Sequence, residues 1–384
     1  MSKTGINNQD ICLVGHPYAP IGMGEKIRCT FRAFKSVNIS PVLTDIYQLT
    51  PPDMDELTEF AGVCDNTPAM INIFHINGDE VENSLTHLSL NTEWPGYNII
   101  YPAWELSRYP REWAEQLDRF DEIWAQSKYT FQALEPICKK PIVHMPETGE
   151  VVLSTFLSRR YFRIPESEYI FLFFFDVRSY LKRKNPYGVI TAFRQVLLLR
   201  PVAKIRLVLK VNGAELAPQV MEELHDHMAD IAEHITLIDR LLSDNETKNL
   251  VRCCDCFVSL HRSEGFGHGM AEAMSLGKPV IATAYSGNME YMASEVSYNV
   301  GYNLIPLQKG DYPHYQNQVW AEPNLDDAIK YMIELIDKPV NGRVIGHKAR
   351  QHMFMNFSYK TIGLRYLQRI EQIYNFVHGE RTSL

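Results

Sequence analysis

The sequence lacks any apolar run near the roughly 20 residues that a membrane-spanning helix requires. Its apolar stretches, such as 169–175, are much shorter, and the N-terminal MSKTGINNQD contains no apolar core of a signal peptide. We therefore expect a cytoplasmic protein. Peripheral contact with the inner face of a membrane stays open, because Phe31, Arg32, Phe34 and Lys35 combine aromatic and basic side chains on one predicted helix.

An excess of positive charge and a disulfide pattern are also missing. The net charge is -8, whereas nucleic-acid-binding surfaces are usually basic, so no nucleic-acid partner is expected. The seven cysteines are an odd number without paired spacing, which suits a reducing compartment. Cys253, Cys254 and Cys256 cluster without a convincing fourth ligand, so we expect buried thiols there and no metal site.

The length of 384 residues fits two domains, each able to bury its own core. Short apolar runs alternate with helical patterns, which predicts parallel sheets built from βαβ units. The strands expected in the first half are 11–15, 71–76, 98–101, 122–126 and 141–144, and those of the second half are 169–175, 204–210, 234–238, 255–260 and 279–283.

These elements predict an α/β protein with two doubly wound, Rossmann-like domains that face a cleft. The expected first domain spans 1–164 and the second spans 165–357, with the joint in the polar stretch that contains Pro165. A last helix within 358–384 is expected to pack back on the first domain. Ser243 and Glu246 have the spacing of a capping box that opens a helix.

The strongest motif is EGFGHGMAE at 264–272, which follows an expected strand and opens a helix. Free N–H groups at a helix start suit a diphosphate or sugar hydroxyls. Glu264 precedes the helix and Glu272 lies within it, so one carboxylate could accept hydrogen bonds from a hexose and the other from a ribose. A packing turn with solvated glutamates is the alternative, but two carboxylates that bracket the turn favour a binding site.

Basic residues follow the first expected strand of the second half. Arg178 and Lys184 lie in the connection to the next helix, where they could clamp two phosphates of a leaving nucleotide. Lys182 and Arg183 are competing candidates. A solvated basic loop is the alternative, but ligands of open α/β sheets bind at the carboxyl ends of strands, which favours the clamp. Lys210 ends the next expected strand and would assist.

Two weaker signals concern the donor side of the cleft. Gly22 and Gly24 follow the first strand in GHPYAPIGMGEKIR without a full G-x-G-x-x-G, so a donor-binding turn and a packing turn are equally open. Backbone groups between Ile238 and Leu241 are candidates for recognising the base.

The acceptor side is expected in the first domain, where aromatic residues gather. Trp104 and Glu105 lie in a loop after a strand, and aromatic rings stack on sugar faces, although they also fill cores. Trp124, inside an apolar strand, is expected to be core. His75 ends the strand in NIFHING and is a further acceptor-binding candidate.

With these motifs in hand, the chain resembles the GT-B glycosyltransferases of the large retaining family 4 across nearly its full length. The E-x7-E spacing from Glu264 to Glu272 matches the signature of that family. HRSEGFG followed by GKPVIATAYSGNMEYM is similar to its polysaccharide-building, O-antigen-type members. The resemblance implies that Glu264 and the amides of Gly265, Phe266 and Gly267 hold the transferred sugar, with Glu272 on the ribose.

The resemblance also implies a reaction. A hexose would move from a nucleotide diphosphate sugar to a hydroxyl of a glycan or lipid-linked glycan, with retention, while Arg178 and Lys184 neutralise the diphosphate that takes the proton from the incoming hydroxyl. Neither a metal nor a cofactor is implied. The D-x-D at 53–55 follows two prolines where a helix is expected to start, which weakens a metal-dependent GT-A alternative.

Two other functions of the same fold stay open. A nucleotide-sugar epimerase would consume donor without an acceptor, and a catalytically silent nucleotide-sugar-binding scaffold would bind without turnover. The complete set of Arg178, Lys184, Glu264 and Glu272 favours the transferase over both. The common histidine of the family at the sugar site is not assigned in this sequence.

Overall fold

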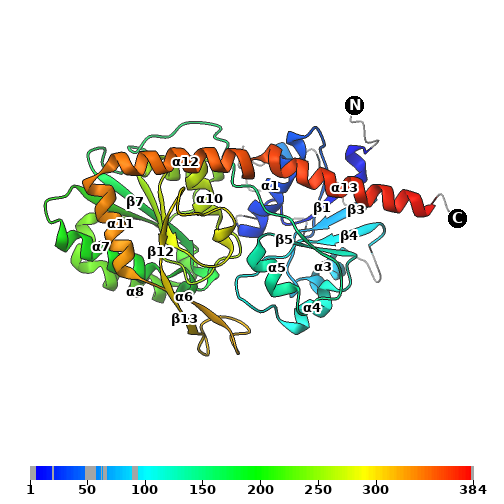
Figure 1. The fold of residues 1–384 in the computed structure, drawn as a ribbon, viewed down its shortest axis with the longest axis horizontal. Coiled ribbons are helices and arrows are strands. Elements are labelled where there is room, and N and C mark those ends of the chain that lie inside the picture. Colours follow the sequence, from blue (N-terminus) through cyan, green and yellow to red (C-terminus); the bar gives the residue numbers. More distant parts are fainter. Residues whose placement is uncertain are drawn as a thin grey trace. The chain divides into compact units, whose positions relative to one another are not determined.

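The computed structural model describes residues 6–19, 21–47, 58–61, 63, 67–88 and 94–381. The chain divides into two compact units (Figure 1). Unit 1 comprises Met1–Gly149 and Met355–Leu384, and unit 2 comprises Glu150–Phe354. The D-x-D at 53–55 lies outside the described residues.

Unit 1 contains a six-stranded parallel sheet with the order β2-β1-β3-β4-β5-β6. Its strands are β1 Ile11–Gly15, β2 Val42–Asp45, β3 Ile71–Phe74, β4 Tyr97–Ile100, β5 Glu122–Ala125 and β6 Ile142–His144. Its helices are α1 Gly22–Ser36, α2 Thr58–Ala61, α3 Val81–His87, α4 Arg111–Leu117, α5 Lys128–Leu134 and α13 Tyr359–Arg381. Parallel strands need crossover connections, and α1 to α5 lie in the connections between successive strands of this sheet.

Unit 2 repeats the plan with the order β12-β11-β10-β7-β8-β9. The strands are β7 Tyr169–Asp176, β8 Ile205–Asn212, β9 Ile235–Ile238, β10 Cys256–Ser259, β11 Val280–Thr283 and β12 Tyr298–Val300. An antiparallel hairpin, β13 Tyr302–Pro306 with β14 Val319–Pro323, follows. The helices are α6 Leu181–Lys184, α7 Pro186–Leu199, α8 Pro218–Met228, α9 Asp244–Cys253, α10 His268–Ser275 and α11 Leu325–Asp337, and α12 Pro339–Phe357 crosses the boundary into unit 1.

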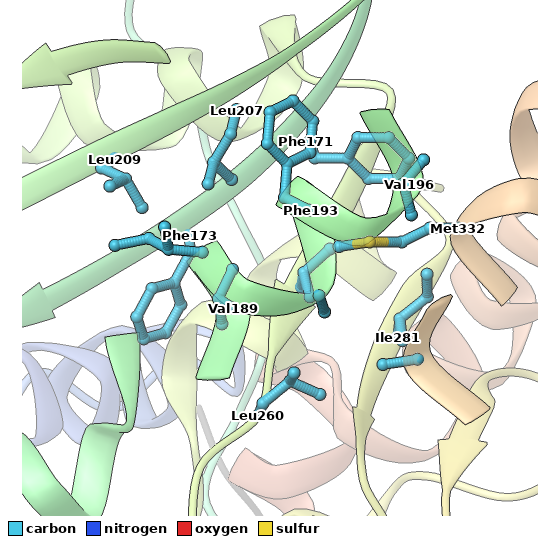
Figure 2. Close-up of a cluster of buried hydrophobic side chains, with 14 of the residues drawn as sticks. Phe171, Phe173, Val189, Phe193, Val196, Leu207, Leu209, Leu260, Ile281 and Met332 are labelled. Atoms are coloured by element: carbon cyan, nitrogen blue, oxygen red, sulfur yellow. The ribbon is translucent and has the colours of Figure 1, made fainter. Parts of the chain in front are cut away.

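The core of unit 2 explains why β7 is so apolar. Phe171 and Phe173 of β7 lie beside Leu207 and Leu209 of β8, and α7 packs its apolar side chains against them (Figure 2). A strand at the centre of a parallel sheet is covered on both faces, so apolar side chains are favoured on both. β7 therefore lies in the core of unit 2.

Unit 1 is completed by the C-terminal helix. α13 packs along α1 (Figure 1), and a Cβ atom added to Gly363 would lie 2.2 Å from the backbone oxygen of Ala33. Phe34 is buried against Tyr366 of α13, and Phe31 is buried against Phe60. These two aromatic side chains are core residues, so they are not the exposed membrane-contact face suggested by the sequence.

The predicted fold class is confirmed: both units are Rossmann-like α/β domains with parallel sheets, and a C-terminal helix is present. Each of the ten predicted strands exists, with ends that differ by at most two residues. Strands β2, β12, β13 and β14 were not predicted. Among the described residues, no helix is both long and apolar enough to cross a bilayer. Cys253, Cys254 and Cys256 are buried, as expected.

Candidate functional site

Unit 2 gathers most of the predicted donor-site residues at the carboxyl ends of its strands. Arg178 follows β7, Lys210 lies near the end of β8, Ile238 ends β9, and Glu264 lies in the connection after β10. The carboxyl ends of parallel strands lie at one edge of a sheet, which is where ligands of open α/β folds bind.

Glu264 is held by two cations of one short helix. Its Oε1 accepts a hydrogen bond from Nζ of Lys184 at 2.5 Å, and its Oε2 lies 3.2 Å from Nη1 of Arg183. Burial acts to raise the pKa of Glu264, but the positive charges of Lys184 and Arg183 outweigh it and lower this pKa to about 2. The carboxylate is therefore ionised at neutral pH and offers only hydrogen-bond acceptors.

The backbone around Glu264 is locked by contacts with the segment after β11. The amide of Glu264 donates to Oγ of Ser286 at 2.8 Å, and the amide of Gly287 donates to the carbonyl of Glu264 at 2.8 Å. A Cβ atom at Gly287 would lie 1.8 Å from the oxygen of Gly265, so only glycine fits there. The hydroxyl of Tyr291 donates to the carbonyl of Phe266 at 2.9 Å.

The turn into α10 needs glycine at its last residue. Gly267 has a φ of +88°, and a Cβ atom there would lie 2.4 Å from Cε of Met270. The hydroxyl of Tyr291 also donates to the carbonyl of Gly267 at 2.7 Å. α10 then starts at His268, and Glu272 is buried within it. The structure thus places the two carboxylates of the E-x7-E motif on either side of a fixed turn.

Arg178 is oriented by the last residue of β7. Its Nε and Nη2 donate to the two carboxylate oxygens of Asp176 at 2.9 and 2.6 Å. This paired hydrogen bond raises the pKa of Arg178. Its side chain is 47% exposed, so a fixed and permanently charged guanidinium reaches solvent at this edge.

Lys210 lies deeper in the same edge. Its Nζ donates to the carbonyl of Val211 at 2.9 Å and also contacts Oδ1 of Asn212. Burial lowers the pKa of Lys210 to about 8, although the nearby Asp176 opposes this shift. Of the two residues predicted to bracket the base-recognition segment, Ile238 is buried and Leu241 is exposed.

The two glycines of unit 1 differ in their surroundings. Gly22 is the first residue of α1, and a Cβ atom there would meet no atom within 4 Å. A Cβ atom at Gly24 would lie 2.1 Å from the carbonyl oxygen of Ala19, so glycine is needed for the turn to pack on the helix. The structure thus supplies a packing reason for Gly24.

The predicted acceptor residues lie mostly inside unit 1. His75 is fully buried, with Nε2 3.0 Å from Oγ1 of Thr30, and burial lowers its pKa to about 3. Trp104 is also buried and donates through Nε1 to the carbonyl of Arg108 at 2.9 Å. Glu105 is partly exposed. Of these three residues, Glu105 therefore has the most surface available to a ligand.

Two residues at the Glu264 site were missed by the sequence interpretation. Arg183 was named only as a competitor for the phosphate clamp, yet it contacts the carboxylate of Glu264 directly. His261 is buried three residues before Glu264, with Nε2 3.0 Å from Oδ1 of Asn288. The available signal was the run of cations Lys182, Arg183 and Lys184 close to the candidate phosphate clamp, but it does not say which of them contacts Glu264.

A family model described as "Glycosyl transferases group 1" matches residues 157–352, which include every site residue of unit 2 described above. No curated protein matches the sequence.

Solved structures similar to this chain share its fold. HepE from Anabaena, solved with UDP and glucose, has a TM-score of 0.68 and 12% identity, over 94% of this chain and 99% of that one. Sucrose-phosphate synthase from Thermosynechococcus elongatus has a TM-score of 0.67 and 14% identity, over 95% and 99%. A TarM variant from S. aureus, solved with Fondaparinux, alpha-GlcNAc-glycerol and UDP, has a TM-score of 0.56 and 13% identity over 79% of this chain. The chain spans 56% of the TarM chain, and at these identities the similarity shows the fold alone.

Proposed function

Because the chain belongs to the glycosyl transferases group 1, we propose that it moves a hexose from a nucleotide diphosphate sugar to a hydroxyl of a glycan or lipid-linked glycan. The observation that carries the proposal is the ionised Glu264, fixed at the carboxyl edge of the unit 2 sheet by Lys184 and Arg183. An ionised carboxylate on a rigid turn suits recognition of sugar hydroxyls, which are hydrogen-bond donors.

The remaining residues are assigned by their chemistry. Arg178 and Lys184 would bind the diphosphate, since both are cations at the strand ends. The amides of Gly265, Phe266 and Gly267 would approach the sugar, and Glu272 the ribose. HepE and the TarM variant were solved with UDP, which makes UDP-sugars the first donors to test.

The proposed reaction proceeds with retention and without a metal, as in family 4. The bond between the anomeric carbon and the diphosphate oxygen breaks, and a bond to the acceptor oxygen forms on the same face of the sugar. The acceptor proton passes to the departing diphosphate. Catalysis then consists of positioning and of charge stabilisation by Arg178 and Lys184.

The proposal further assigns this protein a polysaccharide-building, O-antigen-type role and a cytoplasmic location. It also includes further residues that would contact the donor: Gly22, Gly24, Lys210, Ile238 and Leu241. Of the three predicted acceptor residues, Glu105 is the one that we propose first as a contact with the acceptor, because this residue is partly exposed. No observation at the site favours the epimerase or the silent scaffold over the transferase.

The test combines a donor panel with one variant and its control. Purified protein is screened with nucleotide diphosphate sugars by thermal shift, and donors that bind are assayed with radiolabelled sugar and saccharide acceptors. Glu264→Gln should lower transfer by about 1,000-fold, because it removes an acceptor that is fixed for the reacting sugar. Glu322→Gln, in the nearby ion pair with Arg262, should retain activity. Full activity of Glu264→Gln would refute the assignment.

Retention of the anomeric configuration is tested in a separate experiment. NMR of the product should show the same anomeric configuration as the donor. A product of opposite configuration would exclude the same-face mechanism while leaving the transferase assignment intact. Donor converted to an isomer without any acceptor would instead identify an epimerase.

A further inference from the structure

Two cations contact the Glu264 carboxylate, whereas one cation would be enough to form an ion pair. Arg183 and Lys184, consecutive residues of α6, each contact one of its oxygens. Their side chains differ in exposure, at 4% for Arg183 and 20% for Lys184. If Lys184 binds a diphosphate, the buried carboxylate loses part of its neutralisation at the moment when the donor is in place.

Arg183 is anchored where it lies. Its Nη1 donates to the carbonyl of Ser263 at 2.9 Å and its Nε to the carbonyl of Ser179 at 3.2 Å. The carbonyl of Arg183 in turn accepts from the amide of Arg262 at 2.8 Å. A guanidinium with a rigid fork of donors can hold these carbonyls and a carboxylate together, which a lysine ammonium on a flexible stem does less well.

We propose that Arg183 is a positioning residue that remains the counter-ion of Glu264 while Lys184 moves to the leaving diphosphate. This division of roles rests on the proposed function for the parts played by Glu264 and Lys184. Arg183 itself touches neither the donor nor the acceptor. It keeps the carboxylate ionised and its two oxygens in fixed directions.

Among the described residues that act on the Glu264 carboxylate, only Arg183 and Lys184 are cations at pH 7. The ionisable groups that act on the Glu264 carboxylate are Lys184 and Arg183 of α6 and His261 after β10. Burial lowers the pKa of His261, so this imidazole is neutral at pH 7. Ser286 contributes a hydroxyl near the backbone of Glu264 and no charge. Without Arg183, a donor that engages Lys184 would leave a buried carboxylate with no cation of its own.

The first experiment measures how the variants depend on pH. Arg183→Gln removes the charge, and Arg183→Lys keeps the charge without the planar set of donors. Arg262→Gln is the control, because Arg262 pairs with Glu322 and donates to the carbonyl of Lys182 without contacting the Glu264 carboxylate. Removing a cation at this distance should raise the pKa of Glu264 by about one to three units. The acid limb of kcat should therefore move to higher pH in Arg183→Gln, move less in Arg183→Lys, and stay unchanged in Arg262→Gln.

The kinetic constants give a second readout. At pH 6 we expect kcat of Arg183→Gln to fall by about 100-fold, because a displaced carboxylate misaligns the sugar. The KM for the donor should change much less, since Arg178 and Lys184 still bind the diphosphate. The loss should grow below about pH 5, where Glu264 with its raised pKa begins to be protonated. A pH profile identical to that of the wild type would overturn the proposal.

The last experiment needs no transferase activity. The free energy of unfolding is measured for Arg183→Gln, Glu264→Gln and the double variant, in the full chain, with and without UDP. Arg183→Gln alone should destabilise more strongly than the double variant, because only the single change leaves a buried carboxylate with one cation, Lys184, in place of two. Zero coupling between the two changes would overturn the pairing. Absence of transfer by the wild type, with the coupling present, would refute only the proposed function.

Discussion

Each unit contains a lysine–glutamate pair at the carboxyl ends of its parallel strands, but the two pairs face different surroundings. In unit 1, Nζ of Lys26 lies 3.2 Å from Oε1 of Glu147, and both side chains are nearly inaccessible, at 2% and 3% exposed. In unit 2, the Lys184 side chain of the Lys184–Glu264 pair is 20% exposed. Similar chemistry at corresponding sheet edges is therefore sealed in one unit and open to solvent in the other.

The contacts of Lys26 add to this difference in exposure between the two pairs. Nζ of Lys26 also donates to Oε1 of Gln126 at 2.7 Å and to the carbonyl of Pro102 at 3.1 Å, and it lies 3.7 Å from the ring centroid of Tyr101. Burial lowers the pKa of Lys26 to about 8, while Glu147 opposes the shift. Lys26 thus contributes to the folded state, whereas the role of Lys184 in binding a diphosphate is the one proposed above. The two pairs share their residue types and differ in exposure.

The largest difference between the pairs should appear in catalysis. Lys184→Ala is expected to lower transfer by about 1,000-fold, because it removes a cation that stabilises the departing diphosphate. Radiolabelled sugar transfer measures the loss. Lys182→Ala is the matched control, since Lys182 is the neighbouring lysine and pairs with Asp311 instead. Equal losses in the two variants would mean that a general basic surface, and not the Lys184–Glu264 pair, serves the reaction.

The next largest effect is on stability and concerns unit 1. Lys26→Met should lower the free energy of unfolding by about 3–5 kcal/mol, because Glu147 would remain buried without its cation. Chemical denaturation measures this value. The double change with Glu147→Gln should recover part of the loss. A Lys26→Met protein as stable as the wild type would show that the sealed pair contributes little.

The pairs should also differ in the pH range where they affect stability. The folded pKa of Glu264 is about 2, below its ordinary 4.5, so this group's stabilisation is complete above pH 4.5 and is lost as the pH falls towards 2. The folded pKa of Lys26 is about 8, below 10.5, so the unfolded chain binds more protons between these values. The Lys26 contribution therefore increases as the pH rises through that window.

Denaturant unfolding at a series of pH values tests both signs. Glu264→Gln should flatten the profile between pH 4.5 and 2, and Lys26→Met should flatten it between pH 8 and 10.5. Profiles that keep the wild-type slopes would assign the pH dependence to other groups.

The smallest expected effect is the change in unfolding free energy caused by replacing a glycine before α10 in unit 2 or at the start of α1 in unit 1. Gly267→Ala should cost about 1–3 kcal/mol of unfolding free energy, because a side chain is strained at positive φ and would meet Met270. Gly22→Ala in unit 1 should be close to neutral, since nothing lies within 4 Å of its added Cβ atom. Thermal unfolding measures both. Similar values for the two variants would remove the structural reason for glycine at 267.

The predictable parts of the fold were those governed by local pattern. Strong apolar runs gave the central strands, and the Ser243–Glu246 capping box forms as expected, with hydrogen bonds of 3.1 and 2.8 Å. Strands β2 and β12, of four and three residues, were not recognised, although other strands of the same length were, so length alone does not explain the omission. The β13–β14 hairpin follows the parallel sheet, where the alternating βα pattern stops.

The candidate site was predictable where the order of elements determines position. Arg178, Lys184 and Glu264 follow strand ends, and parallel strands bring such residues to one edge. Burial could not be predicted in the same way. His75 and Trp104 follow strands as well, yet both are buried. Thr30 of α1 contacts His75, and Trp113 of α4 packs against Trp104. The contact between Arg183 and Glu264 depends on side-chain direction within α6, which spacing alone does not give.

The division of the chain has a consequence for the order of folding. Unit 2 is one continuous segment, Glu150–Phe354, whereas unit 1 needs Met355–Leu384 as well as its first 149 residues. During synthesis the strands of unit 1 are made first. Its helix α1 stays uncovered until α13, near the C-terminus, has been made. Unit 2 can close its core while the earlier-made unit 1 is still incomplete, so a ribosome-bound chain should protect Phe171 before Phe34.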